Sequence, residues 1–342
     1  MSFKRLDSQD IVISADSITA PAWSNSSTTL TEFHKDSAQI SRASGDYYYN
    51  IYQTGSGETT AAIQFSLAYG QLDGSGSVPF NPGVPGYSPT AVVYKQFRNL
   101  INGTEETDLS FAGTRVKSIY ALSIERARFK EKLLPGSLYL TLSGSGGKVS
   151  LTDDSNYVTT VTYGDSGREF ELISGSSEGV RFTGNGTDGV YGYNTASGSF
   201  GKFLPDIGVI LLNGDALDLA PANGGITLGT TLSTGSNSVN IDTAYTALAS
   251  GSSFTLRSEE TVSSNYVFIR ARNSEFNYST NPSNITGSGE LRHNVMIDSP
   301  QSFITSVGLY NDNNDLLGIA KLSRPLLKDF TKESLIRVKL DY

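Results

Sequence analysis

The pattern of hydrophobic and polar positions is clearest over the last part of the chain, from residue 303 to residue 342. Two apolar runs, 303–310 and 316–322, flank the polar segment Asn311-Asp312-Asn313-Asn314-Asp315. Asn and Asp tolerate left-handed backbone and hydrogen-bond to their own main chain, so this segment favours a chain reversal. We therefore predict a β-hairpin with a five-residue loop.

The carboxyl-terminal segment, residues 335–342, alternates between apolar and charged positions. This period of two predicts a half-buried strand, with one face apolar and the other polar. We expect the strand to pair with the edge of the upstream hairpin, and its apolar face to be covered by this fold or by a partner. A terminus held in a sheet is ordered and is available for contacts. The apolar positions are Ile336, Val338, Leu340 and Tyr342.

Strand and helix patterns recur upstream. Residues 63–69 alternate as strands do, 266–272 is predicted as a further strand, and 47–52 is a dense tyrosine run. Ser88-Pro89 followed by apolar residues at helical spacing predicts a helix over about 89–101. A second, shorter helix is expected over 242–250, with Asp242 as its N-cap and Gly251 as its end.

Composition supports many short strands joined by turns. The 342 residues include 35 Gly and only 18% charged residues. The predicted fold class is therefore mainly β, with several antiparallel sheets or sandwich-like domains and one or two short helices. We expect three domains: an N-terminal β-rich domain with an arm and one helix over 1–145, a Gly/Ser/Thr-rich middle β domain over 146–260, and a C-terminal β domain over 261–342.

Charge and cysteine content exclude several classes of protein. The net charge is −8 with a pI near 4.9, whereas a nucleic-acid-binding surface needs a basic footprint. The chain has no cysteine, which excludes disulfides and thiolate metal sites. Residues 1–14 lack the apolar core of a signal peptide, and no apolar run approaches the roughly 18 residues that span a bilayer. We expect neither a nucleic-acid nor a membrane partner.

The sequence contains no convincing catalytic, cofactor-binding or metal-binding motif. The two histidines, His34 and His293, are far apart. Residues 184–189 match the letters of a phosphate-binding G-x-G-x-x-G loop, but the required helix does not follow, so a turn is favoured. Residues 312–315 resemble part of a calcium loop without its glycine and its bidentate glutamate, and the hairpin turn is favoured again. We therefore expect no cofactor and no enzymatic activity.

One segment gathers charge in an otherwise charge-poor chain. Its basic residues are Arg126, Arg128, Lys130 and Lys132, with acidic neighbours at Glu125 and Glu131, and the first three are the candidate contact residues. Two interpretations are open. The charges form a solvated face with local ion pairs, which contribute little to stability, or they form a subunit interface, where arginine is enriched. On the second interpretation they contact an acidic surface of a neighbouring protein.

Three groups of residues carry a family resemblance: 79–90 with 94–98, 124–136, and 270–279 with 307–310 and 321–325. Together they resemble virion structural proteins of T4-like marine cyanophages, and the middle of the chain is the least distinctive part. The resemblance implies a non-enzymatic component of the particle, assembled in the host cytoplasm and placed in the contractile tail or its baseplate. It carries no assigned functional residue.

The main functional hypothesis is thus a structural subunit of a phage tail or baseplate, present in multiple copies in a symmetric assembly and contacting other virion proteins. The alternatives are a capsid decoration protein, a neck protein, a receptor-binding fibre module, or a secreted polysaccharide-active β protein. The candidate interface residues are Arg126, Arg128, Lys130, Ile336, Val338, Leu340 and Tyr342.

Overall fold

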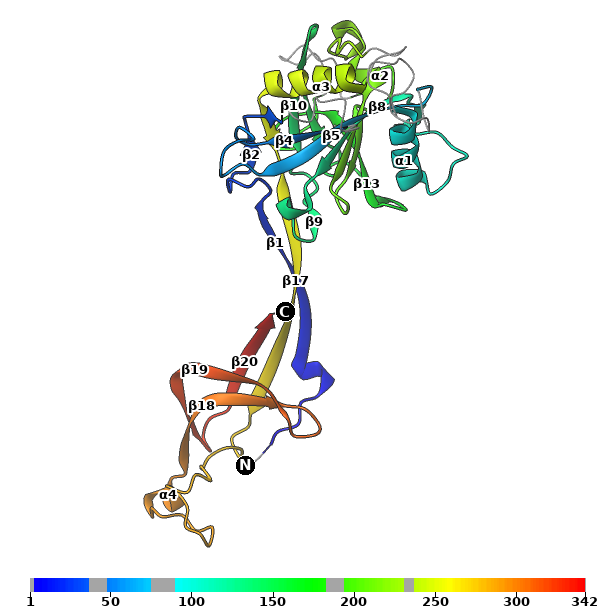
Figure 1. The fold of residues 1–342 in the computed structure, drawn as a ribbon. Helices are drawn as coiled ribbons and strands as arrows, with labels where there is room; N and C mark the ends of the chain where they lie inside the picture. Colours follow the sequence, from blue (N-terminus) through cyan, green and yellow to red (C-terminus); the bar gives the residue numbers. More distant parts are fainter. Residues whose placement is uncertain (1–2, 37–47, 75–89, 183–193, 231–236, 342) are drawn as a thin grey trace. The chain divides into compact units, whose positions relative to one another are not determined.

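The protein is mainly β, as the sequence predicts. The structure is a computed structural model that describes residues 3–36, 48–74, 90–182, 194–230 and 237–341 (Figure 1). The chain divides into two compact units. Unit 1 comprises residues 1–17 and 261–342, and unit 2 comprises residues 18–260. We describe each unit by itself.

Unit 2 is built on one antiparallel sheet of twelve strands. Its order is β2-β16-β10-β11-β13-β14-β15-β8-β5-β4-β3, and β12 pairs with β13 beside this path. The bounds are β2 Thr29–Leu30, β3 His34–Lys35, β4 Tyr48–Tyr52, β5 Ile63–Gln71, β8 Ser118–Ile124, β10 Tyr139–Gly144, β11 Gly147–Asp153, β12 Thr162–Gly164, β13 Gly167–Ser174, β14 Gly201–Leu204, β15 Val209–Asn213 and β16 Ser253–Thr255.

Short elements connect these strands. Within the described residues of unit 2 they are α1 Thr90–Asn102, α2 Gly214–Leu217 and α3 Asn237–Gly251, the small hairpin β6 Ser110–Phe111 with β7 Thr114–Arg115, β9 Lys132–Leu133, and the 3₁₀ turns η3 Arg126–Arg128 and η4 Pro221–Asn223.

The large sheet curls into a half-barrel whose concave side is filled with aromatic side chains. Phe65 on β5 and Phe254 on β16 are separated by six strands in the sheet order, yet their ring centroids lie 5.4 Å apart. Trp23 lies 4.8 Å from Phe254 and donates its indole N–H to the Phe254 carbonyl. Small barrels are filled by side chains in this way. Helix α3 packs against β10, β5 and β4 and covers the same core (Figure 1).

A second core lies on the other face of β8. Ile119 and Ala121 point into it, whereas Tyr120 and Leu122 point into the half-barrel. Helix α1 covers this second core through Tyr94, whose hydroxyl donates to the Val116 carbonyl at 2.6 Å. Strand β8 is therefore buried on both faces.

The helix predicted over 89–101 is confirmed as α1, Thr90–Asn102, although Pro89 lies outside the described residues. The prediction for 242–250 was wrong at its start. Helix α3 begins at Asn237, so Asp242 lies inside the helix, where its side chain pairs with Lys35. The polar residues of the first turn show no apolar helical spacing, so the sequence pattern does not reveal where this helix begins. Tertiary packing overrides the weak helix propensity of these residues.

Helix α3 ends in close contact with β10 at Gly251. A Cβ atom at Gly251 would lie 1.8 Å from the Thr141 carbonyl oxygen, a backbone atom of the sheet. We expect Gly251→Ala to destabilise unit 2 by about 1–3 kcal/mol, because the helix end must move away from the strand. Thermal unfolding followed by circular dichroism measures this effect. Gly57→Ala is the matched control, since nothing lies within 4 Å of its Cβ position, and equal melting temperatures for the two variants would contradict the prediction.

Unit 1 consists of long strands with little helix. In the described residues, β17 lies between β1 and β20 in one sheet, and β18 pairs with β19 in a separate hairpin. β1 ends in unit 2 and β17 begins there, and β9 of unit 2 pairs with β17. The bounds are η1 Ser8–Asp10, β1 Ile11–Pro21, β17 Arg257–Ala271, α4 Val295–Asp298, β18 Gln301–Tyr310, β19 Leu316–Asp329 and β20 Ser334–Asp341.

The predicted hairpin is confirmed, including its loop. The Asn311 amide donates to the Asp315 carbonyl at 3.0 Å, and the Asn311 side-chain oxygen accepts the amides of Asn313 and Asp315. Asn314 takes a left-handed conformation with φ 65°. These are the backbone roles for which Asn and Asp are suited.

The units differ from the three domains expected from the sequence. The proposed boundary at 145/146 falls in the turn between the paired strands β10 and β11, inside the large sheet. Residues 1–17 belong with residues 261–342 rather than with the segment that follows them. The physical reason is strand pairing between distant parts of the chain, because β1 pairs with β17.

Candidate assembly surface

The charged segment at 126–130 lies on η3 and the loop after it, in unit 2. Arg126 donates to the carbonyls of Phe129 and Lys130 and stacks over the Phe129 ring at 4.7 Å. Lys130 pairs with Glu260 at 2.6 Å. The Arg128 Nε is buried and has no hydrogen-bond partner among the described residues. Arg126 and Lys130 are exposed at the surface in addition to making these local contacts, so the structure is compatible with both interpretations of this segment.

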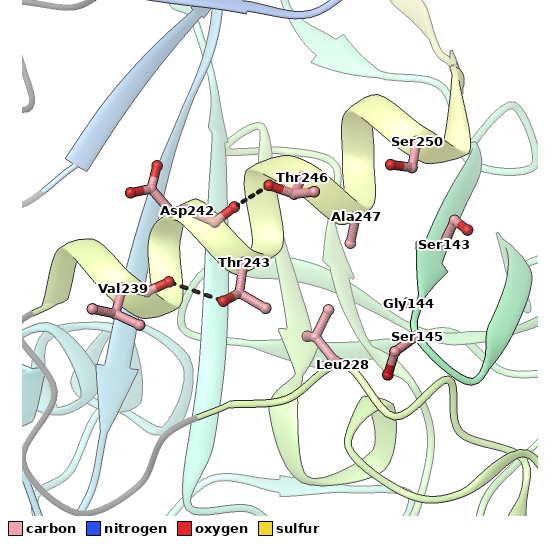
Figure 2. Close-up of a pocket in the computed structure, with 10 residues that line it drawn as sticks. All are labelled: Ser143, Gly144, Ser145, Leu228, Val239, Asp242, Thr243, Thr246, Ala247 and Ser250. Atoms are coloured by element: carbon pink, nitrogen blue, oxygen red, sulfur yellow. Dashed lines mark hydrogen bonds between the residues drawn. The ribbon is translucent and has the colours of Figure 1, made fainter.

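A pocket of about 570 Å³ lies between α3 and the β10–β11 turn (Figure 2). Three of its hydroxyl groups donate to backbone carbonyls: Thr243 to Val239, Thr246 to Asp242 and Ser145 to Thr227. Its one carboxylate, Asp242, pairs with Lys35. Among the described lining residues Asp242 is the only carboxylate, and the others are serines, threonines or small and apolar residues. The lining residues are Ser143, Gly144, Ser145, Leu228, Val239, Asp242, Thr243, Thr246, Ala247 and Ser250.

Three acidic residues near the end of β11 are buried or half-buried and accept hydrogen bonds from backbone amides. Both Asp153 oxygens accept the Gly136 amide, at 2.8 and 2.9 Å. Asp154 accepts the Glu171 amide at 3.0 Å, and Glu171 accepts the Ala112 amide and the Ser199 hydroxyl. Burial raises the pKa of Asp153 and of Glu171. The sequence alone did not single out these residues, because their role depends on which backbone groups lie opposite them.

The raised pKa of Asp154 predicts a pH-dependent stability. Burial is the main cause, with help from the charges of Glu171 and Asp153, and it raises the pKa to about 6 from an ordinary value of 3.8. The folded state therefore holds this proton at pH values where the unfolded state has lost it. The stability contributed by the proton is complete below pH 4 and is lost as the pH rises to about 6 and above.

We expect Asp154→Asn to raise the melting temperature at pH 8 by roughly 1–3 °C and to leave it unchanged near pH 3.5. The neutral amide keeps an oxygen for the Glu171 amide and removes the cost of charge. The gain is modest because the side chain is only half-buried. Asp165→Asn, an exposed carboxylate in the β12–β13 turn, is the control and should have no such effect. A stabilisation of Asp154→Asn that is the same at both pH values would contradict this reasoning.

The predicted C-terminal strand is confirmed as β20, but its partner is not the hairpin. β20 pairs with β17 in antiparallel register from Ser334↔Ala271 to Asp341↔Ser264. Val338 faces Val267, and both side chains are buried, with 6% and 5% exposure. Pairing with the hairpin edge was wrong because proximity in sequence does not decide which strand lies alongside.

The apolar face of β20 is only partly covered. Ile336 is half-buried and Leu340 is 37% exposed, so Val338 is the one buried side chain among the described candidates on this strand. Tyr342 lies outside the described residues. The alternation therefore predicted which side chains share a face, while their degree of burial depends on what packs against that face.

Hydrophobic side chains on the hairpin are more exposed still. The β18–β19 pairing register shifts between Ile304 and Ser306, and Thr305 and Ser306 are both exposed there, so β18 is irregular at this point. The sequence pattern does not mark these side chains as a surface, although the adjacent Leu316 and Leu317 break the alternation. We call the following five residues the hairpin surface: Phe303, Tyr310, Leu316, Leu317 and Ile319, with exposed fractions of 64%, 40%, 48%, 70% and 61%.

Unit 1 has almost no hydrophobic core. Among its described hydrophobic residues, only Val267, Ala271 and Val338 are buried. Its ordered contacts are mainly polar. The fully buried Lys328 donates to the carbonyls of Asn273 and Asp329 and to the Asn277 side chain, which ties β19 to the loop that follows β17. Unit 2, by contrast, has two buried clusters.

Other sequence motifs add no candidate ligand site. Residues 184–189 lie outside the described residues, and 312–315 form the hairpin turn. In the part of the chain that the structure describes, no three His, Cys, Asp or Glu side chains gather where they would hold a metal ion. Within the same ranges, no helix is both long enough and apolar enough to cross a bilayer.

Comparisons with known proteins do not assign a family or a function to this chain. No protein-family model matches the sequence, and neither a curated protein nor a solved structure matches it significantly.

Proposed function

We propose that this chain is a non-enzymatic structural subunit that acts through protein–protein contacts of unit 1. The observation that carries the proposal is the imbalance within that unit: long, ordered strands expose large hydrophobic side chains, and only three described hydrophobic residues are buried. Exposed apolar patches of this kind mark interaction sites in soluble proteins. The proposed role is assembly through unit 1, while unit 2 is a unit that folds around its own core.

The proposed setting is a bacteriophage virion, in the contractile tail or baseplate, with other virion proteins as neighbours. This part rests on the resemblance of residues 124–136 and 270–279, among others, to cyanophage virion proteins. The chemistry of unit 2 is consistent with a structural role, since its buried carboxylates Asp153 and Glu171 are occupied by backbone amides and a hydroxyl. Capsid decoration, the neck and a receptor-binding fibre are the competing locations.

Localisation in the intact particle tests this proposal. A short epitope tag inserted at Gly57 occupies an exposed turn with nothing within 4 Å of the Cβ position, so the fold should accept it. Cryo-EM or gold labelling of phage particles that carry the tagged chain should place it in the tail or baseplate. Labelling on the capsid, at the neck or along a fibre would overturn the tail assignment. Absence of the chain from purified infectious particles would overturn the structural role.

An activity screen is the second test, because the rival class is a polysaccharide-active enzyme. The purified protein should turn over no member of a glycan and ester panel. Reproducible turnover that is abolished by replacing a single carboxylate or serine would refute the non-enzymatic role.

A further inference from the structure

We propose that unit 1 packs against unit 1 of further copies of this same chain, with the hairpin surface and β20 at the contact. The inference goes beyond the proposed function, because it names the first partner of the assembly surface as the chain itself. It is carried by three properties of unit 1: its exposed apolar area, its open strand edges and its charge.

The exposed area matches what a stable interface between subunits needs. β20 adds Leu340 to the five residues of the hairpin surface, and these six side chains are between 37% and 70% exposed. Each leaves on the order of 100 Å² in contact with water, judged from the size of large hydrophobic side chains. The total is several hundred Å², close to the roughly 800 Å² per partner of a standard interface.

The strand edges of unit 1 are open in the described part of the chain. β20 ends the order β1-β17-β20, and β18 and β19 pair only with each other. A row of unpaired amide and carbonyl groups accepts another strand, and an isolated two-stranded hairpin is marginal in water. Unit 1 consists of three strands and a hairpin, and only three of its described hydrophobic residues are buried. Its exposed hydrophobic side chains therefore need to be buried by contacts with another molecule.

The charge of unit 1 favours a copy of itself over a strongly charged partner. Unit 1 contains eleven Lys and Arg residues and eleven Asp and Glu residues, so its formal charge is zero, and unit 2 carries the entire net charge of −8. A surface near zero net charge promotes self-association. An acidic or basic partner would gain no net attraction from this unit, whereas unit 1 of an identical copy meets it without net-charge repulsion between the two units.

Sedimentation equilibrium of the full-length chain tests the proposal. We expect a mass that is an integer multiple, two or more, of 36.6 kDa. The double variant Leu317→Ser with Ile319→Ser should lower the mass to that of one chain, because both side chains are exposed within the chain and contribute only at the contact. Val92→Ser with Val239→Ser, two exposed valines of unit 2, is the matched control and should keep the wild-type mass.

The outcomes separate this inference from the proposed function. A wild-type chain that sediments as a monomer at tens of micromolar would overturn the inference, even if the chain is found in particles. So would a double variant that keeps the wild-type mass. Circular dichroism of the double variant should match the wild type at low temperature, and a single-variant pair, Leu317→Ser and Ile319→Ser tested separately, should give intermediate dissociation. An oligomer in solution that is absent from virions would leave the inference intact and refute the phage role.

Discussion

Deletion of residues 335–342 is expected to unfold unit 1 while unit 2 stays folded. β17 loses its antiparallel partner at seven of the eight register positions, and Val267 loses the Val338 side chain that covers it. Burial of one such side chain contributes about 1.5–3 kcal/mol. Unit 1 buries only three described hydrophobic residues, so it has no other core that compensates for the loss.

Limited proteolysis and hydrogen exchange measure this result. Residues 261–334 should lose protection, whereas residues 18–260 should remain as a protected fragment. Val338→Asp should reproduce the effect of the deletion, because it places an unpaired charge at a buried position. Lys339→Ala is the control, since Lys339 is the next residue on the same strand and is exposed to solvent. Unchanged protection of 261–334 after the deletion would show that β20 serves the interface alone.

Phe254→Ala is expected to produce the largest destabilisation of unit 2, about 3–5 kcal/mol. Phe254 is fully buried and makes edge-to-face contacts with both Trp23 and Phe65, joining two distant parts of the curled sheet. The backbone hydrogen bond from Trp23 survives the change, so the loss measures packing alone. Against a typical net stability of about 5–15 kcal/mol, this leaves unit 2 marginal.

Circular dichroism follows this unfolding, and the fluorescence of Trp23, the one tryptophan of the chain, gives a second probe inside the same core. The melting temperature should fall by roughly 6–20 °C, from about 2–4 °C per kcal/mol for a unit of this size. Tyr163→Ala, which removes an aromatic side chain that is 72% exposed, should change it little. A comparable fall for both variants would show that the half-barrel core is not the stabilising element.

The local features of this protein were predictable from the sequence. The loop 311–315 consists of residues that stabilise a turn by themselves, and the hairpin around it formed as predicted. Helix α1 follows from the apolar residues at helical spacing along it. The alternation over 335–341 correctly marked a strand, because a period of two reflects the backbone geometry of one segment.

What only the tertiary structure decided is which segments meet. Period-two alternation reveals that Ile336, Val338 and Leu340 share a face, but β17 rather than the hairpin lies beside them, and that pairing spans more than sixty residues. The contact between Phe65 and Phe254 depends on the curl of a twelve-stranded sheet, and the grouping of residues 1–17 with 261–342 depends on β1 and β17. Strand register and sheet curvature arise from hydrogen bonds and packing between segments that are distant in the sequence. A local sequence pattern therefore cannot show how much of the hydrophobic surface remains exposed to solvent.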